Sequence, residues 1–350
     1  MRGLILSGGK GTRLRPFTYS GAKQLVPIAN IPVLHFPVRQ LLEAGIDEIG
    51  IVVGETEQQI RDAMGDGSAF GAKFTYIRQT EPLGLAHAVA VSRPFLGDRP
   101  FLMYLGDNVL LGGIRAFVDE FRRTGEPAVI VRSVPDPQAF GVAEVSDGYL
   151  VRMVEKPKEP PTDLAVIGVY AFVPEIFEVI ANQRPSARGE LEIADAINGL
   201  VAAGLRVRAP KTEAYWIDTG KMEDILAANR AVLATLKPEV DSSARVIDSE
   251  LVGQVSIGPG SVVVRSRVIG PAVIGRDARI ERSVVGPDVA LGDRTTVRDS
   301  TVTNAIVMDD TVVERCEGVV DSMLGKDVRL TNLAAGSRLA LGDHSRVEAG

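Results

Sequence analysis

The first 216 residues alternate between short apolar runs and amphipathic stretches. The apolar runs predict strands, and the stretches with apolar residues at i, i+3 and i+4 predict helices. The expected strands are 3–6, 48–53, 73–78, 101–105, 128–133, 142–145, 150–154 and 166–172, and the expected helices are 33–44, 57–64, 85–92, 114–124 and 190–203. This alternation predicts an α/β fold with a mostly parallel sheet covered by helices on both faces. Ligands of such sheets bind beyond the carboxyl ends of the strands.

A different pattern follows the last predicted helix, 221–236. That helix has one polar exception, Asn229, on its apolar face, and Pro238 ends it. From Val252 to Val312, aliphatic residues recur every five or six positions, often followed by glycine. Such a period is typical of a parallel β-helix, in which three short strands close each coil and one aliphatic side chain per strand points inward. Residues 240–341 therefore predict about six coils.

The aromatic residues support a boundary between the two patterns. All eighteen Phe, Tyr and Trp residues lie at or before Trp216. The narrow interior of a β-helix has no room for aromatic rings, whereas a β-sandwich, the alternative for this part, would show strict alternation and some aromatic residues. We therefore expect two domains, residues 1–237 and residues 238–350, the second a left-handed parallel β-helix.

Composition and charge restrict the location and the partners. With 45% hydrophobic and 24% charged residues, the chain has a globular composition, and its net charge of −6 without a long Lys/Arg run argues against nucleic acid. No apolar run approaches the roughly 20 residues of a membrane span, and the N-terminus has no signal-peptide pattern. The single cysteine excludes an internal disulfide, and three scattered histidines argue against a histidine metal site. The sequence predicts a reduced, cytoplasmic protein.

The first predicted strand runs into a glycine-rich turn, SGGKGTRLRP, at residues 7–16. Glycines let the backbone bend tightly and bring N–H groups close to an anion, and Arg13 and Arg15 add positive charge. The turn is neither a P-loop nor a G-x-G-x-x-G fingerprint, because Leu14 stands where the third glycine belongs. By itself it fits either a phosphate loop or a purely structural turn.

The turn is followed by KQLVP at 23–27, and the two motifs together resemble the signature of the sugar-1-phosphate nucleotidyltransferases. Further motifs continue the resemblance through most of the first 236 residues: QTEPLGLA at 79–86, LGDN at 105–108, FGV at 140–142, VEKP at 154–157, RGELE at 188–192 and WIDTG at 216–220. The resemblance implies a Rossmann-like catalytic domain. It also implies an enzyme that converts a sugar 1-phosphate and a nucleoside triphosphate into a nucleotide-sugar and pyrophosphate.

Two short motifs are most similar to those of the family members that use dTTP and α-D-glucose 1-phosphate. Lys23-Gln24 and Gly84-Leu85-Ala86 resemble the thymidylyl pattern, whereas the guanylyl enzymes favour Lys-Pro and Gly-Thr-Ala. The β-helix tail resembles the long form of these members. Leu83 replaces the aspartate of the common short form, so UTP or GTP stays an alternative to dTTP.

The implied reaction needs positive charge rather than a protein nucleophile. The sugar phosphate is already an anion at pH 7, so cations must offset the charge of the reacting groups. Asp107 and Asp218 each follow an apolar segment, and the resemblance implies that they bind Mg²⁺, which prefers few carboxylates together with substrate oxygens. A single aspartate at a strand end also fits a cap or a turn. The resemblance implies catalytic roles for Arg13, Lys23, Asp107, Lys156 and Asp218.

The resemblance also implies binding roles for the other motif residues. Those for the nucleotide are Leu6, Gly8, Gly9, Gly11, Thr12, Arg13, Gln24, Gln79, Pro82 and Gly84. Those for the sugar phosphate are Asn108, Gly141, Glu155, Lys156, Val166 and Arg188. The amide of Gln79 offers the donor and the acceptor that a pyrimidine edge requires, whereas Arg188 also fits an exposed charge near a helix start.

Two other functions stay open. In some relatives the β-helix carries an acetyltransferase, which typically uses a histidine base, but residues 240–343 contain no histidine. A regulatory subunit that only binds a nucleotide-sugar would lack a catalytic cation or carboxylate, but Arg13, Lys23, Asp107 and Asp218 are all present. The flat faces of a β-helix favour stacking, so we expect a homo-oligomer.

Overall fold

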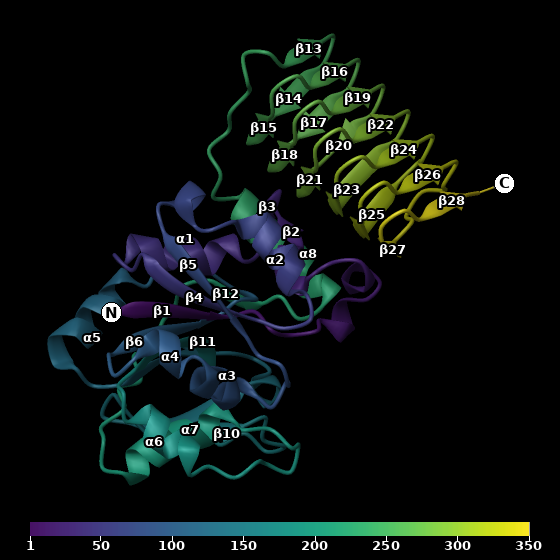
Figure 1. The fold of residues 1–350 in the computed structure, drawn as a ribbon. Helices are drawn as coiled ribbons and strands as arrows, with labels where there is room; N and C mark the ends of the chain where they lie inside the picture. The colour runs from purple at the N-terminus through teal and green to yellow at the C-terminus, as the bar shows by residue number, and fades with distance from the viewer. Residues whose placement is uncertain (350) are drawn as a thin grey trace. The chain divides into compact units, whose positions relative to one another are not determined.

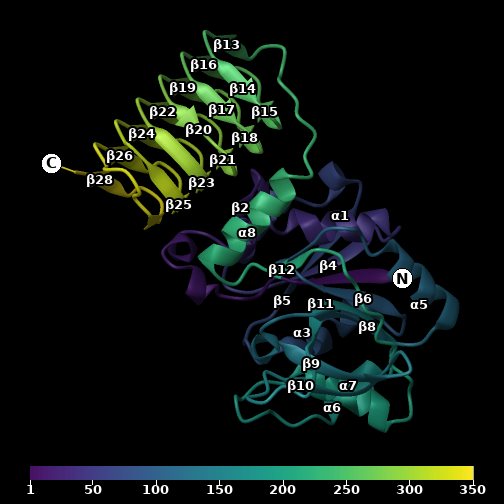
Figure 2. The same ribbon diagram turned by 180° about the vertical axis from the view of Figure 1, so that it is seen from behind.

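The computed structural model describes residues 1–349 (Figures 1 and 2). Its internal contacts define two compact units: Met1–Lys10 with Leu34–Asp218, and Gly11–Val33 with the chain from Thr219 onward. The segment 11–33, which carries Arg13 and Lys23, therefore packs with the C-terminal part of the chain. The domain boundary after residue 237 stays a prediction. None of the helices in residues 1–349 has the length and apolar character needed to cross a membrane.

A mixed sheet forms the centre of the first unit. Its strands are β1 (Arg2–Leu6), β4 (Glu48–Val53), β5 (Lys73–Arg78), β6 (Phe101–Leu105), β8 (Ala128–Ser133), β9 (Gly141–Ser146), β10 (Tyr149–Glu155) and β11 (Leu164–Phe172). Strands β5, β4, β1 and β6 are parallel neighbours in this order, and β11 is antiparallel to β6, β8 and β9. In the described part of the chain, all of these strands except β10 and β11 run in one direction, so the predicted mostly parallel sheet is confirmed.

Helices cover both faces of this sheet. They are α1 (His35–Glu43), α2 (Glu57–Met64), α3 (Leu85–Val91), α4 (Arg93–Leu96), α5 (Arg115–Thr124), α6 (Ile176–Ala181) and α7 (Ile193–Ala202), with 3₁₀ turns η4 (Ser68–Phe70) and η5 (Pro137–Ala139). Neighbouring residues of β1 lie on opposite faces of the sheet, because successive side chains of a strand point in opposite directions. Leu4 packs in a core with α3, α6 and α7, whereas Gly3 lies against Leu41 of α1. The predicted helices are confirmed, with ends that differ by a few residues.

The second unit contains the solenoid and the elements packed on it. Segment 11–33 forms 3₁₀ turns η1 (Thr12–Leu14), η2 (Phe17–Tyr19) and η3 (Lys23–Leu25) and the hairpin β2 (Pro27–Ile28) and β3 (Ile31–Pro32), and α8 spans Met222–Leu233. The solenoid strands are β13 (Arg245–Ile247), β14 (Glu250–Val252), β15 (Val255–Ile257), β16 (Val262–Val264), β17 (Arg267–Ile269), β18 (Ala272–Ile274), β19 (Arg279–Glu281), β20 (Val284–Val285), β21 (Val289–Leu291), β22 (Thr296–Arg298), β23 (Thr301–Val307), β24 (Val312–Glu314), β25 (Val319–Leu324), β26 (Arg329–Thr331), β27 (Ala340–Leu341) and β28 (Arg346–Glu348). Helix α8 contacts β21, β23 and β25 of the solenoid.

Successive coils of the solenoid pair in parallel, as the strands stacked like rungs in Figure 1 illustrate. Residues at equivalent positions of successive coils stack in columns and lie 16 or 17 residues apart in the chain. One such column consists mainly of serines and begins at Ser249. In that column each hydroxyl accepts a hydrogen bond from the backbone N–H one coil later, and Cys316 continues the column with its N–H 3.0 Å from Ser300 Oγ. The inward aliphatic residues, such as Val263 and Ile280, are fully buried. The predicted parallel β-helix is confirmed.

Asn229, the polar exception on α8, links three parts of the second unit. Its side chain is buried, and its Oδ1 accepts a hydrogen bond from the N–H of Ala29 at 2.8 Å. Its Nδ2 donates to the carbonyl of Asp288 in the solenoid at 3.3 Å. One amide therefore connects α8 with segment 11–33 and with the solenoid, which explains a polar residue on an otherwise apolar face.

We expect the substitution Asn229→Leu to lower the free energy of unfolding by about 1–3 kcal/mol, because the N–H of Ala29 would stay buried without an acceptor. Denaturant titration followed by circular dichroism measures this loss. Asn182→Leu is the matched control, since the Asn182 side chain is exposed on the end of α6, and it should change stability by less than about 0.5 kcal/mol. Equal losses in the two variants would contradict this role of Asn229.

Candidate active site

A cavity of about 130 Å³ in the first unit brings together most of the residues predicted to bind the sugar phosphate. Its predicted lining residues are Asn108, Gly141, Glu155, Lys156, Val166 and Asp218. They come from β7 (Asn108–Leu110), β9, the end of β10, β11 and β12 (Trp216–Asp218). Gly141 lies directly opposite Glu155 in the β9–β10 ladder, and a Cβ at position 141 would lie 3.2 Å from Glu155 Oε2. The methyl carbon of Met153 would lie nearer still, at 2.2 Å, so the close packing of Met153 against the strand requires a glycine here.

The two predicted metal ligands are close because β7 pairs with β12. Asp218 lies opposite Asn108 in this antiparallel ladder, and Asp107 directly precedes Asn108. Sequence analysis missed both strands, since three residues are too few to show a period. Within residues 1–349, no cluster of three or more His, Cys, Asp or Glu side chains is suited to hold a metal ion. A hard cation at Asp107 and Asp218 would need further oxygen ligands, which is the arrangement that Mg²⁺ favours.

Two cations lie beside the Glu155 carboxylate. Lys156 Nζ is 3.5 Å from Glu155 Oε1, and Arg188 Nη2 is 3.4 Å from the same oxygen. Arg188 Nη2 also pairs at 2.7 Å with Glu192, which is only 7% exposed, and this hydrogen bond raises the pKa of Arg188. The Arg188 guanidinium is thus held next to Glu155 and is not an isolated surface charge.

Three residues predicted to bind the base also lie together in the first unit. Gln79 Nε2 donates to the carbonyl of Gly84 at 3.2 Å, and a Cβ at Gly8 would lie 3.2 Å from Gln79 Oε1. Leu6 ends β1 just before Gly8, whereas Gly9 and Pro82 are exposed in the adjoining loops. These residues surround the carboxyl ends of β1 and β5, as expected for a ligand site of a parallel sheet.

Gly84 is required by the backbone as well as by the predicted base contact. Its φ is 103°, and a Cβ would lie 2.5 Å from the carbonyl oxygen of Leu191. We expect Gly84→Ala to lower stability by about 1–3 kcal/mol and to raise the KM for the nucleotide several-fold, since the loop that holds Gln79 must shift. Thermal denaturation and initial rates measure the two effects.

Gly148→Ala serves as the control for Gly84→Ala. Gly148 has φ 80°, so it shares the backbone strain, but no atom lies within 4 Å of the added Cβ. This variant should lose stability without any change in the nucleotide KM. A nucleotide KM for Gly84→Ala equal to that of the unmodified protein would remove Gly84 from the base site.

The remaining predicted residues, Gly11, Thr12, Arg13, Lys23 and Gln24, lie in the second unit. Lys23 and Gln24 are buried, at 6% and 2% exposure. Gly11 has φ 63°, and a Cβ there would lie 2.8 Å from Lys23 Cβ, so only glycine lets the loop pack this closely on Lys23. The Arg13 guanidinium lies over Gly220, 3.0 Å from where a Cβ would stand. The predicted site residues thus form one group in each unit.

Several residues that line the cavity of about 130 Å³ had no role assigned from the sequence: Phe140, Met153, Gly168, Tyr170 and Trp216. This cavity is called the sugar-side cavity below. The rings of Phe140 and Trp216 meet edge to face, with centroids 5.1 Å apart. Burial, and to a smaller extent the Glu155 carboxylate, raises the pKa of Tyr170, so its phenol stays protonated. Phe140 and Trp216 stand inside the motifs FGV and WIDTG, which was the available signal.

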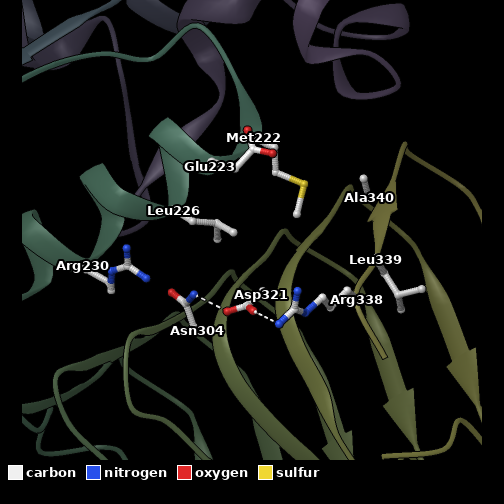
Figure 3. Close-up of a pocket in the computed structure, with 9 residues that line it drawn as sticks. All are labelled: Met222, Glu223, Leu226, Arg230, Asn304, Asp321, Arg338, Leu339 and Ala340. Atoms are coloured by element: carbon white, nitrogen blue, oxygen red, sulfur yellow. Dashed lines mark hydrogen bonds and ion pairs between the residues drawn. The ribbon is translucent and has the colours of Figure 1, made fainter. Parts of the chain in front are cut away.

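A second cavity, of about 450 Å³, lies within the second unit and contains none of the predicted site residues (Figure 3). Met222, Leu226 and Arg230 of α8 line one side. On the solenoid side, Asn304 Nδ2 donates to Asp321 at 2.7 Å, and Asp321 pairs with Arg338 at 3.2 Å. The Oδ1 of Asn304 is buried without a hydrogen-bond partner, so this row of polar groups is only partly satisfied.

Comparison with known proteins gives concordant matches. The family described as nucleotidyl transferase matches residues 2–235. A glucose-1-phosphate thymidylyltransferase of Streptomyces griseus is 48% identical over 312 residues, which cover 88% of this chain and 87% of the relative. Another, of Streptomyces antibioticus, is 42% identical over 356 residues and 99% of both chains, so this match includes the solenoid.

Solved structures give a similar result for the N-terminal part. A crystal structure of a candidate glucose-1-phosphate thymidylyltransferase from Bacillus anthracis, in complex with a sucrose, is similar with a TM-score of 0.64 and 34% identity. The similarity covers 68% of this chain and 97% of that chain. The match to this structure and the match to the family therefore cover similar lengths of the chain.

Proposed function

Because the chain belongs to the nucleotidyl transferase family, and within it to the glucose-1-phosphate thymidylyltransferases, we propose that it transfers a thymidylyl group from dTTP to α-D-glucose 1-phosphate and releases pyrophosphate. One observation carries the assignment of the site. The β7–β12 ladder sets Asp218 opposite Asn108, which directly follows Asp107, and Asp218 lines the cavity together with Glu155 and Lys156. This cavity combines groups suited to a sugar ring, to a phosphate and to a divalent cation.

The reaction is a direct displacement at phosphorus. A phosphate oxygen of glucose 1-phosphate forms a bond to the α-phosphorus of dTTP, and the bond from that phosphorus to the β-phosphate oxygen breaks. Pyrophosphate carries away the electron pair, and no protein nucleophile takes part. The protein therefore acts by orienting two anions and by offsetting their charge.

Lys156 and Arg188 bind the sugar phosphate in this proposal. Their positive charges lie at 3.5 Å and 3.4 Å from Glu155 Oε1, so both stand beside the group that accepts hydrogen bonds from sugar hydroxyls. Gly141, Val166 and Asn108 line the same cavity and offer the sugar polar backbone and amide groups. Hydrogen bonds between ions are shorter and stronger than neutral ones, which favours a fixed orientation of the phosphate.

Asp107 and Asp218 would hold Mg²⁺. Residues 1–349 contain no group of three or more His, Cys, Asp or Glu side chains suited to a metal, and two carboxylates suit Mg²⁺, which keeps coordination positions for substrate phosphates. When bound, it neutralises charge on the triphosphate and on the departing pyrophosphate. Arg13 and Lys23 add positive charge for the triphosphate, and Gly9, Gly11 and Thr12 offer backbone N–H groups from the loop.

Gln79 and Gly84, with Leu6, Gly8, Gln24 and Pro82, bind the base in this proposal. Preference for dTTP over UTP depends on one methyl group and one hydroxyl, and a methylene-sized difference is worth about 1–3 kcal/mol. UTP is therefore the closest competitor. The cytoplasmic location and the homo-oligomer stay predictions.

Phosphorus NMR of the complete reaction tests the reaction type. The protein is incubated with dTTP, glucose 1-phosphate and Mg²⁺, and the signals of dTDP-glucose and pyrophosphate are followed. We expect the two products to appear in equal amounts and to require the sugar phosphate. Pyrophosphate released without a nucleotide-sugar would indicate hydrolysis and would contradict direct transfer to the sugar phosphate.

A further inference from the structure

We propose that Trp216 is a positioning residue for the Asp107 carboxylate, acting through Asn108. The proposal rests on the proposed function, since it gives Asp107 a role at the metal. It adds a link that the motifs do not reveal. The indole would serve both the sugar-side cavity and the carboxylate that holds the cation.

The link consists of two hydrogen bonds in series. Trp216 Nε1 lies 2.6 Å from Asn108 Oδ1, and Asn108 Nδ2 lies 2.9 Å from Asp107 Oδ1. The β7–β12 ladder brings these side chains together, because it sets Trp216 opposite Leu110 and Asp218 opposite Asn108. Asn108 is only 2% exposed, so water has little access to its amide.

The indole determines how the amide is oriented. An indole N–H donates and cannot accept, so Asn108 must turn its oxygen toward Trp216. The NH₂ group then faces Asp107 and donates to a charged oxygen, which makes this bond stronger than one between neutral groups. Without the indole N–H, the amide would lose the partner that fixes this orientation, and the Asp107 carboxylate would be held less firmly.

The indole is itself held in place. It meets Phe140 edge to face at 5.1 Å, and its backbone belongs to the same short strand as Asp218. Trp216 also lines the cavity next to Glu155 and Lys156. In this proposal sugar phosphate and metal would contact two ends of one hydrogen-bonded chain, so any effect of one on the binding of the other must be reciprocal. A residue that merely lines the cavity would not give this coupling.

The chain offers a direct probe, because Trp216 is its only tryptophan. Full-length protein labelled with ¹⁵N-tryptophan should give a single indole cross-peak in a ¹H–¹⁵N spectrum. Titration with MgCl₂ should shift this cross-peak to a plateau. In Asn108→Ala, the cross-peak should move toward the position of an indole without this acceptor and should no longer respond to Mg²⁺.

Metal affinity gives the second measurement. Binding of Mn²⁺ to the nucleotide-free protein is measured from the loss of the free-ion EPR signal. We expect Asn108→Ala and Trp216→Phe each to weaken Mn²⁺ binding about tenfold, as found when groups that orient metal ligands are removed. Trp216→Phe keeps an aromatic ring beside Phe140 and lacks only the N–H donor. Met153→Leu is the matched control, since Met153 lines the same cavity but takes part in neither hydrogen bond, and this variant should bind Mn²⁺ as the unmodified protein does.

The possible outcomes distinguish a failure of the role proposed for Trp216 from a failure of the proposed function. Normal Mn²⁺ affinity in both Asn108→Ala and Trp216→Phe, in a protein that makes dTDP-glucose, would overturn the role of Trp216 and leave the function intact. An equal loss of Mn²⁺ affinity in Met153→Leu would also overturn it, because the effect would then come from the cavity wall. An unmodified protein that neither binds Mn²⁺ nor releases pyrophosphate would instead overturn the proposed function. If Asn108→Ala does not fold, Trp216→Phe alone decides.

Discussion

Replacement of Asp107 by asparagine is expected to lower kcat by at least about 10³-fold, because the metal supplies several kcal/mol of stabilisation to the charge that develops in the transition state. The substitution keeps the shape of the side chain but removes one of the two carboxylates proposed to hold the cation. Asp107 follows β6 and precedes the strand that pairs with Asp218, so its loss leaves a single carboxylate for the cation. Initial rates of pyrophosphate release, with circular dichroism to verify folding, measure the effect.

Asp119→Asn is the control for this substitution. Asp119 lies on α5, its side chain is 56% exposed, and it pairs with Arg122 at 3.3 Å on the helix surface. Its loss should leave kcat unchanged, because an exposed ion pair contributes little and stands outside the cavity. Turnover of folded Asp107→Asn near that of the unmodified protein would remove Asp107 from the metal site.

Lys156→Met is the second change with a large expected effect. Methionine has nearly the length of lysine but carries no charge, so the sugar phosphate would lose an ionic hydrogen bond. We expect kcat/KM for glucose 1-phosphate to fall about 10- to 100-fold, in line with the 1.5–3 kcal/mol that a hydrogen bond to a charged group contributes. The KM for dTTP should change much less, and initial rates with each substrate varied in turn test this difference.

The neighbouring lysine provides a control for the Lys156 substitution. Lys158 is also exposed and lies two residues further along the same loop, but it does not line the cavity. Lys158→Met should leave both kinetic constants unchanged. A similar fall in kcat/KM for the two variants would mean that the general charge of the loop, and not a contact from Lys156, attracts the sugar phosphate.

The sequence was most informative where a pattern is long. Strands β4, β6 and β11 are continuous apolar runs, and the structure has them at or within a few residues of the predicted positions. The solenoid repeats its aliphatic residues over many coils, so its period is visible without any knowledge of tertiary structure. Asn229 looked like an exception to the helical pattern because its hydrogen-bond partners, Ala29 and Asp288, lie far away in the chain.

Contacts between segments that lie far apart in the chain could not be predicted from the sequence. Strands β7 and β12 have three residues each, and only their pairing brings Asp218 next to Asn108 and Asp107. Segment 11–33 follows the first strand, yet it packs with α8 and the solenoid, for example through Asn30 Nδ2, which donates to the carbonyl of Leu291 at 2.6 Å. No local propensity encodes such a contact. The motifs identified Asp107, Lys156 and Gln79 as candidates but gave no role to Trp216.

The most direct test of the proposed function is pyrophosphate release with glucose 1-phosphate and Mg²⁺, measured separately with dTTP, UTP, GTP, ATP and CTP. Equal concentrations of each triphosphate allow the kcat/KM values to be compared. We expect the highest value with dTTP, and UTP as the closest competitor. Release that is fastest with another triphosphate would contradict the thymidylyl assignment, and no release with any of them would contradict the proposed reaction with glucose 1-phosphate.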